Sequence, residues 1–348
     1  MKFQSFIYAK LRSFVGACGV AGVLQFGVLA SSAQTNIYGF TGVMTNITLN
    51  PGLYDITAYG ARGGNAGSRL GGLGAKMAGR FSFATTVNLR LLVGGVGRLD
   101  LMGNAAGGGG GSFVVYGNIP LVVAGGGGGA WYLSPGGGSG SVSTGGSGGF
   151  GGDGAFYGGG GGGGYRGDGT NAFGSGAGGG SSFLNGGAGG VGGSVGSYNR
   201  GGYGGGGGGG GGTGPGGGGG YSGGSGGSGG YGLGGGSIID SSAVGIIAAT
   251  SGVASPDGSA NGEIIITAVP KPIVLASPST AGGNFGFNIT GPTNATIVIE
   301  ACTNLANPAW IPVATNVLSS GTNYFSDAHW TDDLYRFYRV SEPKTLNP

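Results

Sequence analysis

The chain has 348 residues, of which 98 are glycine, and only 8% of its residues are charged. Its net charge of +3 comes from 15 basic and 12 acidic residues, and three of the basic ones are Lys2, Lys10 and Arg12. Without that N-terminal cluster the charges balance, which excludes the basic footprint of a nucleic-acid binder. Aromatic residues make up 10% of the chain, unlike an ordinary disordered sequence. No strict Gly-X-Y period is present, so a collagen triple helix is excluded.

The first 33 residues have the pattern of a signal peptide. The basic residues precede a mostly apolar stretch at 14–29, and small residues at 31–33 suit cleavage before Gln34. A membrane anchor is the alternative, although the stretch is short and interrupted by glycine. We therefore expect a secreted protein, extracellular or at the cell surface, without a transmembrane span. Cys302 would then be the only cysteine, which excludes an internal disulfide.

Antiparallel strands are expected from Asn36 to Ala124, because apolar and polar residues alternate there with period two. The expected strands are 43–49, 53–59, 75–83, 87–93, 113–115 and 121–123. Pro51-Gly52 predicts a hairpin-like turn between the first two of them.

A zone of glycine and serine with scattered aromatic residues then extends from 125 to about 236. β-type composition returns at 238–249 and 263–269. A strand beyond the glycine zone indicates an insertion in a β-framework, so residues 34–269 are expected to form one domain.

The punctuation Pro270-Lys271-Pro272 opens a second expected domain, residues 270–348. Short apolar runs with turn residues between them predict a small all-β sandwich of roughly 75 residues, a size that folds alone only marginally. The expected strands are 285–289, 296–301, 312–316, 324–326 and 336–340.

Several motifs follow one another in the first domain. They are Tyr54-Asp55-Ile56-Thr57-Ala58-Tyr59-Gly60-Ala61-Arg62-Gly63-Gly64, then Leu91-Leu92-Val93-Gly94-Gly95-Val96-Gly97, the glycine tracts at 107–111 and 125–129, and Asn261-Gly262-Glu263-Ile264-Ile265-Ile266. This order resembles the glycine-rich extracellular domain of the anaplastic lymphoma kinase and leukocyte tyrosine kinase receptors. The resemblance implies a β-sandwich framing a bundle of polyglycine-II helices, a construction also seen in certain phage tail-fibre adhesins. No kinase sequence accompanies it, so neither kinase activity nor cytokine binding is expected.

The second domain resembles a short β-sandwich module found at the C-termini of large secreted bacterial proteins, for which no activity is implied. The matching stretches are 285–291, 300–305 before Trp310, and 336–340. The sequence thus predicts an all-β chain, with a β-sandwich framing polyglycine-II helices and a small C-terminal β-sandwich.

Physical chemistry sets a condition on the glycine bundle. Strands without Cβ atoms approach closely enough to bond to one another, which satisfies backbone groups that cost about 1–3 kcal/mol each when buried unpaired. Ordering costs about 1–2 kcal/mol per residue. Because the two quantities nearly cancel, we expect the bundle to need an apolar frame.

No catalytic, cofactor-binding or metal-ligating residue is expected, and we predict that the chain is not an enzyme. The single histidine, His329, lies in an acidic loop at 327–333 that either binds a metal or forms a solvated turn. Gly-x-Ser-x-Gly windows around Ser147, Ser225 and Ser228 carry no information within a Gly/Ser tract. Arg166-Gly167-Asp168 is interpreted as a chance occurrence of an integrin-binding tripeptide.

Aromatic residues in the glycine zone are the candidate partner-contacting residues. They either stack on sugars or partner surfaces from loop tips, or plug the bundle against the sheets. The candidates are Trp131, Tyr132, Tyr157, Tyr165, Tyr203 and Tyr221. A locally basic set of residues also has two interpretations, because it either binds an acidic glycan or forms a solvated strand face. The set consists of Arg62, Arg69, Lys76, Arg80, Arg90 and Arg98.

The expected function is adhesion or recognition, by an exported surface or matrix protein whose rigid glycine-rich scaffold contacts an unknown protein or glycan ligand. The alternative is a purely structural coat or matrix component that self-associates, with a loose glycine-rich zone. Nothing in the sequence identifies the ligand.

Overall fold

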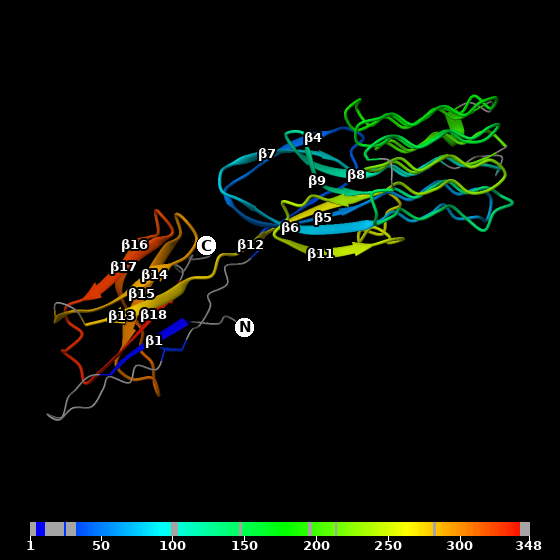
Figure 1. Ribbon diagram of the computed structural model, residues 1–348. Coiled ribbons are helices and arrows are strands. Elements are labelled where there is room, and N and C mark those ends of the chain that lie inside the picture. The colour runs from blue at the N-terminus through cyan, green and yellow to red at the C-terminus, as the bar shows by residue number, and fades with distance from the viewer. Residues whose placement is uncertain are drawn as a thin grey trace. The chain divides into compact units, whose positions relative to one another are not determined.

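The computed structural model describes residues 5–10, 24–25, 33–98, 104–145, 148–193, 197–212, 214–280 and 283–341. The expected all-β class is confirmed: the described part consists of strands and glycine segments, with one 3-10 turn, η1 (Ser197–Asn199). Two compact units are present, one from Gln34 to Val269 and one that combines Met1–Ala33 with Pro270–Pro348. Figure 1 labels the strands of both units. Among the helical residues described, none forms a segment long and apolar enough to cross a membrane.

Two five-stranded antiparallel sheets form the frame of the first unit. The first sheet has the order β10 (Ile238–Ile239), β9 (Ile119–Ala124), β8 (Ser112–Tyr116), β7 (Val87–Leu92) and β4 (Thr45–Leu49). The second has the order β11 (Gly245–Thr250), β6 (Lys76–Phe83), β5 (Gly52–Tyr59), β12 (Glu263–Val269) and β3 (Thr35–Tyr38).

An apolar core lies between these sheets. Ile56, Phe81 and Ile264 of the second sheet share one buried cluster with Leu89 and Val122 of the first. In β7 the exposed Asn88 and half-buried Arg90 alternate with buried neighbours, as the period-two pattern predicted. This core provides an apolar frame of the kind expected for the glycine segments.

One sequence-based expectation about these strands is wrong. Pro51-Gly52 does not close a hairpin, because β4 pairs with β7 and β5 pairs with β6, so the chain crosses between sheets at this turn. Residues 238–249, where β-type composition returns, contribute to two strands. Asp240 begins a turn that separates β10 in one sheet from β11 in the other. In both places the partner is chosen by burial of an apolar face rather than by the nearest turn.

Glycine segments occupy the connections between these strands, at 60–75, 94–111 and 125–237. Figure 1 shows them running side by side away from the two sheets. Their amides bond to carbonyls of other segments: Gly108 N donates to Gly207 O at 2.9 Å, and Gly109 N to Gly127 O at 2.7 Å. Further bonds join Gly126 to Gly219 and Gly160 to Gly208, both at 2.8 Å. The backbone groups of the glycine tracts are thus satisfied between segments, while their polyglycine-II geometry stays a prediction.

Glycine is required in these segments because neighbouring backbones leave no room for a side chain. A Cβ added to Gly108 would overlap the carbonyl oxygen of Gly217, and one added to Gly60 would overlap that of Gly125. At Gly230, by contrast, nothing lies within 4 Å of the added atom. Close packing of bare backbone therefore explains why a side chain is excluded at positions such as Gly60 and Gly108.

Amide exchange should show this order directly. We expect the amides of Gly108, Gly126 and Gly160 to exchange at least about a thousandfold more slowly than those of an unstructured chain, because each donates to a neighbouring segment. Glycine-selective 15N labelling with NMR-detected exchange provides the measurement. Rapid exchange throughout 136–236, with the sheets still protected, would instead support the loose glycine zone.

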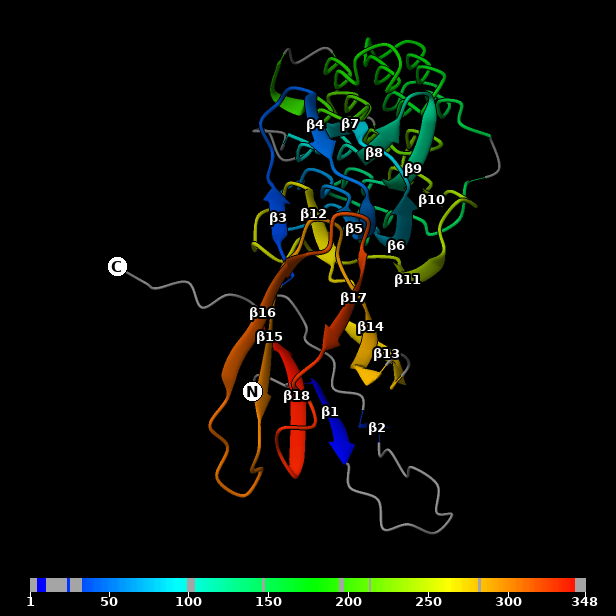
Figure 2. The same ribbon diagram turned by 90° about the vertical axis from the view of Figure 1, so that its left-hand side faces the viewer.

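The second unit is a small two-layer β-structure (Figure 2). One sheet has the order β13 (Val274–Ser279), β14 (Phe285–Thr290) and β17 (Thr322–Asp327). The other has β16 (Ile311–Val317), β15 (Thr296–Cys302), β18 (Tyr335–Ser341), β1 (Ser5–Lys10) and β2 (Leu24–Gln25). Its core contains aromatic and aliphatic residues from both sheets, including Phe285, Phe287, Ile299 and Tyr338.

The strand β1 is antiparallel to β18, with Ser5 opposite Val340 and Lys10 opposite Tyr335. Both β1 and β2 belong to the expected signal peptide. Residues 1–4, 11–23 and 26–32 of that peptide lie outside the described residues. Cleavage before Gln34 would remove both strands and leave the β18 edge unpaired.

A buried polar cluster joins β17 to β18. Asp327 accepts hydrogen bonds from Arg336 Nε and the Tyr338 hydroxyl, both at 2.8 Å, and from the backbone N–H of His329 at 2.8 Å. Only 7% of the Asp327 side chain and 17% of the Arg336 side chain are exposed. The carboxylate is thus fully engaged inside the sandwich.

Candidate recognition surface

The six candidate aromatic residues separate into two groups of three. Tyr165, Tyr203 and Tyr221 lie against the first sheet, where they pack with a cluster that includes Leu92 and Phe113. Tyr165 is only 2% exposed, and its hydroxyl donates to the Asn118 carbonyl at 2.8 Å. Burial raises the pKa of the Tyr165 and Tyr203 hydroxyls. These three residues have the geometry of plugs.

Trp131, Tyr132 and Tyr157 instead lie at turns between glycine segments. The rings of Trp131 and Tyr132 meet edge to face at 5.5 Å, and Tyr132 is exposed. Tyr157 is 54% exposed and meets the ring of Phe156 edge to face at 4.7 Å.

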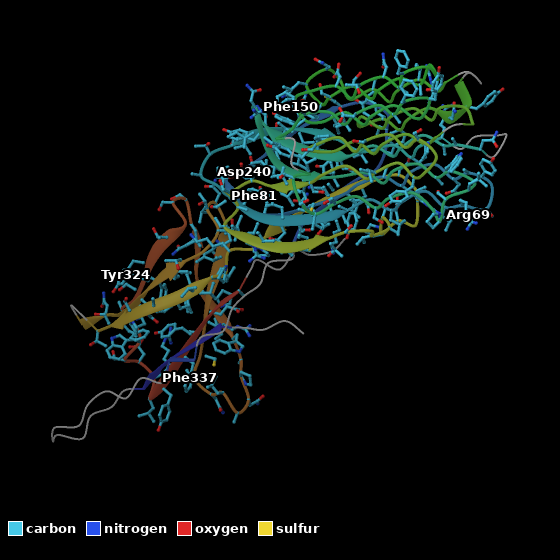
Figure 3. All side chains as sticks on the ribbon, turned by 45° about the vertical axis from the view of Figure 1, so that its right-hand side comes forward. Arg69, Phe81, Phe150, Asp240, Tyr324 and Phe337 are labelled. Carbon is cyan, nitrogen blue, oxygen red and sulfur yellow. The ribbon has the colours of Figure 1, made fainter. Side chains whose placement is uncertain are left out.

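Backbone hydrogen bonds bring these turns together at one end of the glycine segments. Tyr132 N donates to Asn104 O, and the adjoining residues are linked in turn from Gly216 to Ala106, from Gly227 to Pro215 and from Gly159 to Gly227. Figure 3 shows this end at Arg69, which lies away from Phe81 and Phe150 beside the sheets. We refer to this end, which carries Trp131, Tyr132, Phe156, Tyr157 and Phe173, as the tip surface.

Phe173 was missed as a candidate in the sequence. Its ring stacks on that of Phe156 at 5.1 Å with an interplanar angle of 17°, and the two are 67% and 63% exposed. The signal that pairs them is a repeated alanine–aromatic step, at 155–156 and 172–173, each directly before a turn. Two stacked, exposed phenylalanines next to an exposed tyrosine form an apolar platform held by backbone hydrogen bonds.

The conformation of Tyr157 is unusual for a residue with a side chain. Its φ is 51°, in the left-handed region that costs a non-glycine residue about 1–2 kcal/mol. The facing Gly174 has φ 83°, and a Cβ there would lie 2.5 Å from the tyrosine ring. Strain of this kind persists where surrounding structure imposes it, and it is common at binding sites.

A cavity of about 370 Å³ opens where four distant segments meet. Its lining includes Arg62 and Asn65 from the first connection, Arg98 from the second, Tyr198 from η1, and Ala260 before β12. Among the lining residues that the structure describes, none is acidic. No motif in the sequence indicates that these residues converge.

Other basic residues of the expected set are engaged on the sheets. Arg80 forms a two-point ion pair with Asp55, at 2.6 and 2.8 Å. Lys76 lies 5.6 Å from the ring centroid of Tyr59, and Arg90 lies 5.2 Å from that of Phe183. For these three the strand-face interpretation fits the contacts.

The remaining motifs do not assemble into chemical sites. The His329 ring contacts Asp332 at 3.3 Å on the surface, whereas Asp327 and Asp333 both pair with Arg336, so the carboxylates of this loop do not gather around the histidine. No group of three or more histidine, cysteine, aspartate or glutamate residues suited to a metal occurs within the described ranges. Ser147 lies outside those ranges.

The carboxylate of the Arg-Gly-Asp tripeptide holds a neighbouring loop. Asp168 accepts from Ser182 N at 2.6 Å and from Asn185 Nδ2 at 3.0 Å. The bond from the Ser182 backbone is the main reason that the Asp168 pKa is lowered, with smaller contributions from Asn185 and the Ser182 side chain, opposed by burial. A structural role thus accounts for this aspartate.

A scan against protein-family models finds none that matches the chain, and a search of curated proteins finds no match.

Proposed function

We propose that this chain is an exported, non-enzymatic recognition protein of a cell surface or extracellular matrix, which contacts its ligand through the tip surface. The observation that carries the proposal is the division of the aromatic residues. One group packs against the frame. The other lies on turns whose backbones are hydrogen-bonded to neighbouring segments, with Tyr132 and Tyr157 exposed and Trp131 half-buried. Exposed aromatic rings held on a rigid scaffold suit contact with sugar faces or partner surfaces.

The resemblance to the glycine-rich receptor domains supports the scaffold part of the proposal. Inter-segment hydrogen bonds and the absence of space for Cβ atoms are what a polyglycine-II bundle requires. Export rests on the signal-peptide pattern, and we expect the exported chain to begin at Gln34, which its intact mass checks.

Removal of the tip aromatics tests recognition. We expect the triple variant Tyr132→Ala, Tyr157→Ala, Phe173→Ala to lose at least about tenfold in binding on glycan arrays and whole cells, since aromatic contacts dominate such interfaces. Tyr335→Ala, which removes an exposed tyrosine from the other unit, is the matched control and should bind normally. Unchanged binding by a folded triple variant would contradict the tip surface as the contact site, and uniformly blank arrays would count against recognition.

Self-association is a second candidate function, favoured by the edge strand β16. Its residues Ile311, Val313 and Val317 are exposed along one open edge, an arrangement that promotes pairing between chains. Concentration-dependent sedimentation of the chain beginning at Gln34 distinguishes this candidate, because a recognition protein of the first kind needs no oligomer.

A further inference from the structure

The cavity bounded by Arg62, Arg98 and Tyr198 has the properties of an anion site. Two guanidinium groups border it, and none of the described residues in its lining is acidic. Within the described ranges neither Arg62 nor Arg98 forms an ion pair; Asp100, two positions further on, lies outside them. A guanidinium group that forms no ion pair among the described residues can bind a carboxylate through two parallel hydrogen bonds.

Backbone hydrogen bonds fix the walls of the cavity before any ligand arrives. Arg62 N donates to Ala260 O at 2.8 Å, Gly97 N to Arg62 O at 3.0 Å, and Arg98 N to Arg200 O at 2.9 Å. The Arg62 side chain is held as well, because its Nε donates to the Gly71 carbonyl at 3.3 Å. Among the described residues its two terminal nitrogens form no ion pair. A site arranged in this way loses little conformational entropy on binding.

The size and lining of the cavity indicate a second property of its ligand, in addition to negative charge. A volume of about 370 Å³ lies within the range of small-ligand sites and exceeds what a simple inorganic anion fills. Val96 and the exposed ring of Tyr198 supply apolar surface beside the arginines. A ligand that satisfies both features carries a carboxylate on a ring whose C–H face stacks on tyrosine.

We propose that this cavity binds a carboxylate-bearing sugar, such as a hexuronic acid unit of an acidic polysaccharide. Arg62 and Arg98 pair with the carboxylate, and the Tyr198 ring packs against the sugar face. The inference rests on the proposed recognition function and names one ligand class for it, at a site separate from the tip aromatics.

Titration calorimetry of the chain beginning at Gln34 tests this inference. The probes are a tetrasaccharide that contains glucuronic acid, its neutral glucose counterpart and tetraglutamate. We expect the uronate to bind, the neutral sugar to bind at least about tenfold more weakly, and binding of the uronate to weaken between 50 and about 300 mM salt. Equal binding of tetraglutamate would overturn the sugar assignment, and equal binding of the neutral sugar would overturn the role of the arginines.

Matched variants locate the site. Arg98→Gln and Arg62→Gln should each raise the Kd for the uronate about tenfold or more, as expected for the loss of a charge-assisted hydrogen bond. Tyr198→Ala should weaken binding of the uronate while leaving any binding of tetraglutamate unchanged. Arg69→Gln removes an exposed arginine of the same unit that does not line the cavity, and should change the Kd less than twofold. An equal loss in Arg69→Gln would show diffuse attraction and overturn the site.

The proposed uronate site can be wrong while the proposed recognition function is right, and the experiments distinguish the two cases. If neutral glycans or cells bind through the tip surface and the cavity variants make no difference, only the uronate site is wrong. If neither the arrays nor the uronate titration shows binding, both proposals fail. Each variant is compared with the parent chain in thermal unfolding, and Arg98→Gln, at an exposed position, serves where Arg62→Gln proves unstable.

Discussion

Gly108→Ala should destabilise the glycine-rich unit by about 3 kcal/mol or more. The added Cβ would overlap the carbonyl oxygen of Gly217, which is main chain and cannot rotate away as a side chain would. Gly108 also donates to Gly207 and accepts from Gly202, both at 2.9 Å, so a shift of its backbone loses two hydrogen bonds. Overpacking of this kind costs about 1–3 kcal/mol, and more where the neighbours are held. In a unit of this size the thermal midpoint should fall by roughly 6–12 °C.

Gly230→Ala is the control, and its effect should have the opposite sign. Nothing lies within 4 Å of a Cβ at this position, and its φ does not fall in the left-handed region. The substitution then acts mainly on the unfolded chain, where lost backbone entropy stabilises the fold by about 0.4–1 kcal/mol. Thermal unfolding of both variants measures whether the two substitutions differ in their effect on stability. Equal, small effects at the two positions would mean that the glycine segments do not pack against one another in solution.

The strands that the sequence predicted are those whose burial alternates. In β7, Val87, Leu89 and Leu91 are buried while Asn88 faces solvent, so a period of two is visible without a structure. The strands β3 and β13 escaped prediction because they are edge strands with little burial to pattern them. Pairing was harder still, since the turn at Pro51-Gly52 looks local although its two strands belong to different sheets.

The candidate site shows a different limit of sequence reasoning. Tyr157 and Tyr165 both border the same glycine tract, yet one is exposed at the tip surface and the other is buried against the first sheet. Seven glycines separate them. A segment of that length runs from one end of the bundle to the other, so the two tyrosines lie at opposite ends. The hydrogen-bond register between segments decides the outcome, and glycine carries no side-chain pattern that encodes register. The cavity at Arg62 and Arg98 was hidden for the same reason.

Asp327→Asn should destabilise the second unit by about 3 kcal/mol. The carboxylate accepts from Arg336, the Tyr338 hydroxyl and a backbone N–H, and its loss leaves the Arg336 charge largely buried with a weakened partner. For a domain of roughly 75 residues this corresponds to a thermal midpoint lower by about 12–24 °C. Asp333→Asn is the matched control. It contacts the same arginine at 2.8 Å but is more exposed, so its effect should stay below about 1 kcal/mol.

The polar cluster around Asp327 also makes the stability of the second unit depend on pH. Burial alone would raise the pKa of Asp327, but the bonds from Tyr338 and His329 and the charge of Arg336 outweigh burial and lower it below the ordinary value of 3.8. Because the folded pKa lies below the unfolded one, the contribution is complete above pH 3.8 and is lost as pH falls through the folded pKa. Amide exchange of residues 285–341 in the whole chain, followed from neutral to acid pH, measures it. Asp327→Asn should remove this acid limb while Asp333→Asn retains it, and an unchanged limb in Asp327→Asn would assign the acid sensitivity to another carboxylate.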